Sequence, residues 1–142
     1  MACPFFYATE KFAERRWLAH PQVPLGDPYD GECHARQDGY RPGDEELRNL
    51  CNLGYVRKTC PRFPQDAGPD AVRFSVSRDE QQRIVIRYVQ ERDHRPWEHG
   101  WLEYHVREQK FVQPHANRIV NRLAEAYAEA YLRRRMAPKL DG

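Results

Sequence analysis

The chain has 142 residues, of which 40% are hydrophobic and 12% aromatic; this composition can supply a core and argues against wholesale disorder. Its 23 Lys and Arg residues nearly balance 21 Asp and Glu, for a net charge of +2, so there is no strong nucleic-acid signal and no sign of an anionic-membrane binder. No apolar run approaches the roughly 18 residues of a membrane span, and no secretory signal is visible. These properties predict a soluble, cytoplasmic protein.

The composition changes near Pro69. Residues 1–69 hold eight of the 11 prolines, six of the eight glycines and all four cysteines, but only two of the 12 Val and Ile residues. A segment with so little regular apolar patterning needs a cross-link or a metal to be ordered. We therefore predict a cysteine-rich cluster-binding or metal-binding segment over residues 1–69 and a regularly folded unit over residues 70–142, together forming one integrated domain.

The first half contains two short helix candidates. One covers Thr9–Ala19, and the other covers Pro42–Leu53, where leucines recur at helical spacing. Between them, residues 25–31 are almost all of turn-forming types and predict two consecutive turns.

Three strands are expected in the second half. Apolar and polar residues alternate from Val72 to Ser77, which is the period of a half-buried strand, and a polar turn leads to a second strand over Ile84–Val89. The second strand is apolar on both faces and therefore requires a cover on each side. Residues 91–100 are expected to form a polar loop interrupted by Pro96, and Trp101–Val106 to form the third strand.

A long helix is expected from about Pro114 to Met136, because apolar residues recur there every three to four positions. The predicted fold class is therefore α+β: a small three-stranded antiparallel sheet with a long C-terminal helix (β-β-β-α), preceded by a Pro/Gly-rich, cofactor-stapled N-terminal half. We expect the helix to cover one face of the sheet and the cysteine-rich half to cover the other.

Most of the functional information lies in the four cysteines, Cys3, Cys33, Cys51 and Cys60. Two disulfides would require an oxidising compartment, which the missing secretory signal does not favour. Four unrelated buried thiols are a second interpretation, although Cys3 and Cys60 each precede a proline outside any apolar periodic stretch. A structural zinc ion is a third, but zinc ligands usually come in close Cys-x2–4-Cys pairs, whereas here the shortest gap is eight residues.

A [4Fe–4S] cluster fits the pattern better, because a cluster held by four thiolates is larger than an ion and tolerates widely spaced ligands. Proline after a ligand removes a donor and turns the chain away from the cluster, and the sequence has this at Cys3-Pro4 and Cys60-Pro61. The cations Arg57, Lys58 and Arg62 lie beside the last two cysteines. We expect them to neighbour the cluster, because positive charge lowers the cost of burying an anionic group.

The sequence thus predicts a small iron–sulfur protein that binds one [4Fe–4S] cluster, for electron transfer or for structural ordering, with a redox protein or a larger complex as partner. One alternative is a zinc-stapled, non-enzymatic binding module or a subunit of a larger assembly. A further alternative is an enzyme with an open-iron cluster, in which Cys3 is the cysteine that does not ligate because it lies near a terminus. No sequence motif identifies catalytic residues for such an enzyme.

Overall fold

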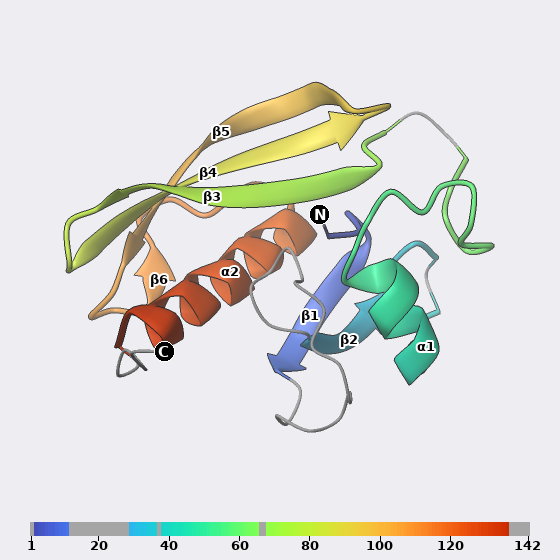
Figure 1. Ribbon diagram of the computed structural model, residues 1–142, viewed down its shortest axis with the longest axis horizontal. Helices are drawn as coiled ribbons and strands as arrows, with labels where there is room; N and C mark the ends of the chain where they lie inside the picture. The colour runs from blue at the N-terminus through green and yellow to red at the C-terminus, as the bar shows by residue number, and fades with distance from the viewer. Residues whose placement is uncertain (1, 12–28, 37, 66–67, 137–142) are drawn as a thin grey trace, which may run out of the picture.

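The computed structural model describes residues 2–11, 29–36, 38–65 and 68–136. They form two antiparallel sheets, a short helical segment and one long helix (Figure 1). The smaller sheet pairs β1 (Phe6–Lys11) with β2 (Tyr29–Cys33), and the larger sheet has the order β3-β4-β5-β6. The bounds of the remaining elements are α1 (Asp44–Glu46), η1 (Leu47–Cys51), β3 (Ala71–Asp79), β4 (Arg83–Arg92), β5 (Arg95–His105), β6 (Lys110–Phe111) and α2 (Arg118–Met136).

The expected fold class is wrong in its strand and helix content. The large sheet has four strands instead of three, and the first half contributes a second sheet and a short helical segment. The expected loop over residues 91–100 is paired strand, because β4 and β5 continue to a tight turn at Asp93 and His94, both of which have positive φ. The sequence of residues 91–100 shows no strand pattern because much of this end of the hairpin faces solvent and its residues are mostly polar.

The first half also departs from the expected helices. Thr9 to Lys11, the start of the first candidate, lie in β1, and the rest of that candidate lies outside the described residues. The strand period begins earlier, with Phe6 and Ala8 buried and Tyr7 between them only partly buried. Of the expected turns, residues 29–31 lie in β2, and residues 25–28 are not among those described.

Other expected elements are confirmed. The hairpin of β3 and β4 has Phe74 opposite Tyr88 and Val76 opposite Ile86, and the helix expected over Pro42–Leu53 is present as α1 followed by the π-helical turn η1. The long helix begins at Arg118, later than expected, because the side chain of Asn117 accepts the N–H groups of residues 119 and 120 and caps its first turn.

We expected the cysteine-rich half to cover the second face of the large sheet, but in the structure it does not. Figure 1 shows β1 and β2 beside α2, on the same side of that sheet. Tyr29 donates its hydroxyl to the Ala126 carbonyl at 3.1 Å, and Arg122 donates to the Ala8 carbonyl at 2.6 Å. The other face, here called the outer face, is open to solvent and includes the exposed side chains of Arg87 and Trp101.

One continuous core lies between these layers. It joins Phe6 and Leu47 of the first half to Ile86 and Leu123 of the second. Four alanines at every second position of α2, starting at Ala124, are fully buried. Such positions lie on opposite sides of a helix, so these small residues let α2 pack between the two sheets. No helix among the described residues has both the length and the apolar character needed to cross a membrane.

Candidate functional site

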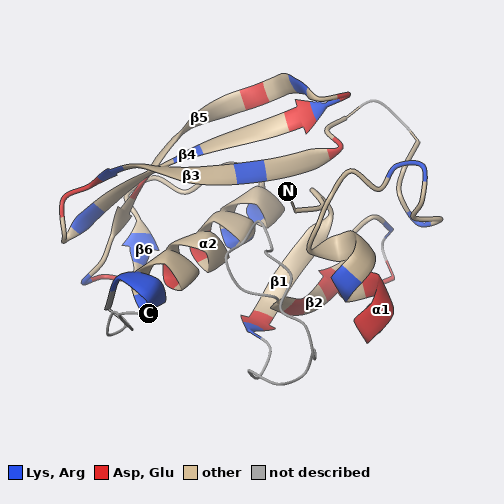
Figure 2. Cartoon of the chain, in the orientation of Figure 1, with Lys and Arg blue, Asp and Glu red and all other residues tan. Residues whose placement is uncertain are grey.

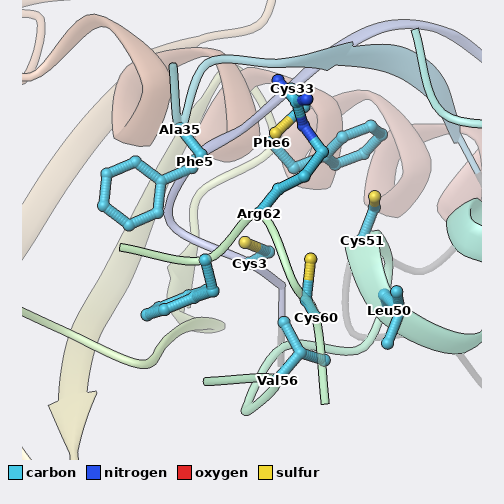
Figure 3. A pocket seen from close by; sticks show the side chains of 11 residues that line it. Cys3, Phe5, Phe6, Cys33, Ala35, Leu50, Cys51, Val56, Cys60 and Arg62 are labelled. Atoms are coloured by element: carbon cyan, nitrogen blue, oxygen red, sulfur yellow. The ribbon is translucent and has the colours of Figure 1, made fainter. Parts of the chain in front are cut away.

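The four cysteines line one pocket, although they lie far apart in the sequence (Figure 3). The cavity itself is small, about 20 Å³, and it opens to solvent. Besides the cysteines, its wall consists of apolar side chains and one arginine: Phe5, Phe6, Ala35, Leu50, Val56, Phe63 and Arg62. The site is therefore a sulfur-rich, largely apolar cavity, and Arg62 is the one cation among the described residues of its wall.

Each cysteine comes from a different segment. Cys3 precedes β1, Cys33 is the last residue of β2, Cys51 is the last residue of η1, and Cys60 lies in the loop that follows. Main-chain hydrogen bonds tie these segments together: the Cys3 N–H donates to the Cys51 carbonyl at 3.1 Å, and the Cys33 N–H donates to the Tyr40 carbonyl at 2.7 Å. The fold thus brings the four thiols together before any cofactor is considered.

The N-terminal segment is held firmly. Ala2 and Val72 exchange two main-chain hydrogen bonds of 2.8 Å, so the segment before β1 pairs with the edge of the large sheet. Cys3 is buried, with 8% of its surface exposed. The structure therefore gives no reason to single out Cys3 as the cysteine most easily released from a cluster.

The environment of Cys3 and Cys51 disfavours the ionised form of these two thiols. Burial raises the pKa of Cys3 to about 12, and the nearby Cys33 and Cys60 add to the rise through charge repulsion. Burial also raises the pKa of Cys51, with further contributions from Cys3, Cys33 and Cys60. All four are free cysteines. Since a thiolate is the form that ligates a metal, loading this site must release protons.

Arg62 is the cation in the pocket wall. Its Nη2 donates to both carboxylate oxygens of Asp38, at 2.6 and 2.7 Å, and its guanidinium lies 4.2 Å from the Tyr40 ring centroid. Hydrogen bonds to Asp38 and then to Cys33 raise the pKa of Arg62, so it stays charged. Its Nε is buried and has no hydrogen-bond partner among the described residues. An anionic sulfur-bearing group in the pocket would give this orphaned donor an acceptor.

The other two expected cations lie elsewhere. Arg57 forms an ion pair with Asp70 at 2.5 Å and donates to the carbonyls of Pro64 and Gly68. With Lys58 it lines a separate, polar pocket. Arg57 approaches the cysteine site only indirectly, because its guanidinium stacks over Phe63, whose ring is part of the pocket wall.

No group of three or more His, Cys, Asp or Glu side chains that could hold a single metal ion occurs among the described residues. A tetrahedral zinc site needs its sulfurs about 2.3 Å from one point. His34 does not line the pocket; it pairs with Glu32 at 3.2 Å and stacks on Tyr7. The described groups therefore share a pocket without converging on one ion.

Sequence reasoning missed Asn52, the residue that joins two cysteine-bearing segments. It is fully buried, accepts the Tyr29 N–H at 3.0 Å, and donates to the carbonyls of Tyr29 and Leu47 at 3.0 and 2.9 Å. Asn52 follows Cys51, and Tyr29 begins the strand that ends at Cys33. Its place directly after a candidate ligand was the one available signal, and Asn is too common beside helix ends to be diagnostic.

Comparison with known proteins yields no relative for this chain. No family model, no curated protein and no solved structure matches it. The functional argument therefore depends on the site alone.

Proposed function

We propose that this protein binds one [4Fe–4S] cluster through Cys3, Cys33, Cys51 and Cys60. The observation that carries the proposal is the meeting of four free cysteines, from four separate segments, around one largely apolar pocket. Iron–sulfur clusters of this type are held by four cysteine thiolates. The apolar wall would limit the access of water to the iron and sulfide.

A cluster accounts for this arrangement better than a single ion does. Zinc requires its ligands to converge on one point, and the described residues contain no such group. A cubane cluster carries its iron atoms at separate corners, so its ligands surround a volume instead of a point. Four cysteine side chains around a shared pocket are compatible with the larger group.

Arg62 supports the same proposal through its charge. A cluster with four thiolate ligands is anionic, and burying an anion costs less beside a cation and a free N–H donor. Arg62 supplies both, since it stays protonated and its Nε has no acceptor among the described residues. Asp38 and Tyr40 hold the guanidinium in place.

The proposed role includes both ordering and electron transfer. Binding at four segments would supply folding free energy to the first half, and a bound cluster would supply one-electron redox chemistry. Cys33, Cys51 and Cys60 are partly exposed, which places the site near the surface, where a redox partner or larger complex could approach. Four reduced thiols suit a reducing compartment such as the cytoplasm.

The first experiment is iron, zinc and acid-labile sulfide analysis of anaerobically purified protein. We expect about four irons and four sulfides per chain and a brown colour. Changing Cys33, Cys51 or Cys60 to Ser should abolish or sharply lower the iron content, because a hydroxyl is a poor replacement for a soft thiolate ligand. His34→Gln is the matched control and should keep its iron, since His34 lies outside the pocket wall.

Two results would overturn the proposal. Stoichiometric zinc without sulfide would establish the zinc-stapled module instead. Full iron and sulfide content in all three serine variants would show that these cysteines do not hold the group. Cys3→Ser should also lose iron; retained colour with an altered electron paramagnetic resonance spectrum would instead indicate an open iron and the enzyme alternative.

Arg62→Gln distinguishes electron transfer from ordering alone. Removing a positive charge beside the cluster should disfavour the more negative, reduced state and lower the reduction potential. Lys58→Gln is the control, because Lys58 is exposed and lines a different pocket. A lowered potential in Arg62→Gln alone supports the redox role. A cluster that no reductant can reduce, with only stability lost in the variant, would leave the structural role.

A further inference from the structure

Two large aromatic side chains lie exposed on β5. Trp101 has 58% of its surface exposed and Trp97 has 52%. Trp101 lies on the outer face of the large sheet, opposite Arg87 of β4. Trp97 is the extra residue of a β-bulge opposite Gln90 and Glu91, nearer the β4–β5 turn. Neither is part of the cysteine pocket, and exposed tryptophans in a pair are unusual on a surface with no binding role.

Arginines accompany both tryptophans. The guanidinium carbon of Arg87 lies 5.8 Å from the Trp101 ring centroid, and that of Arg92 lies 5.9 Å from the Trp97 centroid. Arg95, at the start of β5, is exposed. None of these three arginines has an ion pair among the described residues, although Arg92 is partly buried, donates to the Gly68 carbonyl at 3.1 Å and lies near Asp70. We call the five residues Arg87, Arg92, Arg95, Trp97 and Trp101 the aromatic–basic strip.

Most acidic groups near the strip are already engaged. Glu91 is buried and accepts from Arg73 and from the Tyr55 hydroxyl, and Glu103 pairs with Arg83. Asp93 at the turn is exposed and lines a pocket with Arg57 and Lys58, outside the strip. Figure 2 shows basic and acidic residues meeting at this end of the hairpin. The strip is therefore locally positive although the whole chain is nearly balanced.

From this geometry we infer that the aromatic–basic strip binds single-stranded nucleic acid. The occupant must bring flat rings to the tryptophans and negative charge to the arginines, and a nucleotide chain brings both in every unit. Open antiparallel sheet faces with exposed aromatics suit this task, because unpaired bases stack on the rings while the phosphates contact cations. An acidic polypeptide matches only the charge. Because three cations are involved, the affinity should be modest and salt-sensitive. The inference is independent of the cofactor in the cysteine pocket.

The test is fluorescence anisotropy of end-labelled oligothymidylate and oligouridylate with the full chain, at low and at physiological salt. Both oligonucleotides offer bases for stacking and phosphates for ionic contacts, so binding of either one supports the inference. Trp101→Ala should raise Kd by about 5-fold to 150-fold, the range for loss of one stacked base. Arg87→Gln should reduce the slope of log K against log salt by about 0.7.

The controls are Arg36→Gln and Arg48→Gln, each of which removes an exposed arginine of the first half, away from the strip. Both should bind like the parent, and circular dichroism should show every variant folded. Equal binding of polyglutamate would overturn the inference, because it would show that charge alone is recognised. An absence of binding at low salt, or equal weakening by the controls, would overturn it as well.

Discussion

The buried side chain of Asn52 offers the sharpest test of how the fold builds the cysteine site. Asn52→Ala removes three hydrogen bonds of 2.9 to 3.0 Å: two link the end of η1 to the start of β2, and the third closes onto the Leu47 carbonyl of η1. It does not remove any residue of the pocket wall. We expect both the stability and the cofactor content to fall, because Asn52 holds together the segments that carry Cys51 and Cys33.

The magnitude follows from the number of bonds. A hydrogen bond contributes about 1 kcal/mol net, so three buried bonds predict a loss of about 3 kcal/mol in the free energy of unfolding. For a domain of this size, that corresponds to a fall in Tm of about 6 to 12 °C. The small cavity left by the amide adds to the loss.

Asn49→Ala is the matched control, because Asn49 is exposed on the same helical turn. Urea unfolding of parent, Asn52→Ala and Asn49→Ala should be followed by circular dichroism in the same cofactor state, so that the contribution of the cofactor cancels. Iron content is measured in parallel. We compare the loss in the free energy of unfolding caused by each substitution. If the two losses differed by less than about 1 kcal/mol, the buried amide of Asn52 would not be the link we describe.

Two further predictions concern packing and pH. In Gly31→Ala the added Cβ would lie 2.2 Å from the Tyr7 carbonyl oxygen. Because that neighbour is backbone, we expect the free energy of unfolding to fall by about 1 to 3 kcal/mol. Gly43→Ala is the control: its Cβ would have no atom closer than 3.9 Å, so it should cost under about 1 kcal/mol in the same unfolding assay. Burial raises the pKa of Asp70, but hydrogen bonds from the Asp93 amide and from Arg57 outweigh it and hold that pKa below its usual value. The resulting stability is present above about pH 4 and is lost as pH falls through the lowered pKa. The free energy of unfolding of Asp70→Asn should therefore depend less on pH between about pH 4 and 2 than that of the parent. An equal pH dependence of the two proteins in this range would contradict this account.

The regular parts of the second half could be predicted from periodicity. In β3 and α2 one side of the element is buried, so apolar residues recur with the period of a strand or of a helix, and this period is visible in the sequence. The β4–β5 extension could not be predicted in this way, because Gln90, Glu91 and Glu98 are polar residues satisfied by side-chain partners instead of by solvent. Strand β6 has two residues, too few for any period to appear.

The cysteine set was predictable as a group, whereas its surroundings were not. Spacing and the Cys-Pro pairs singled out all four cysteines, and the structure places them around one pocket. Sequence distance was a poor guide to the cations: Arg57 and Arg62 are both close to Cys60 in the chain, yet a buried carboxylate, Asp70, draws Arg57 away. Which cation reaches the thiols depends on where the acids lie, and that is a tertiary property.

The order of the first half does not rest on the cofactor alone. Phe6, Val56 and Phe63 line the cysteine pocket and also belong to the core shared with Val72 and Leu123. Burial of these side chains contributes free energy whether or not the pocket is loaded. A cofactor bound here would therefore act on a framework that apolar packing has already assembled. Its main energetic effect would fall on the groups that packing leaves unfavourable: the buried thiols and the Nε of Arg62, which has no hydrogen-bond partner among the described residues. Packing brings the thiols together, and the charge of the bound group would then offset the cost of holding them there.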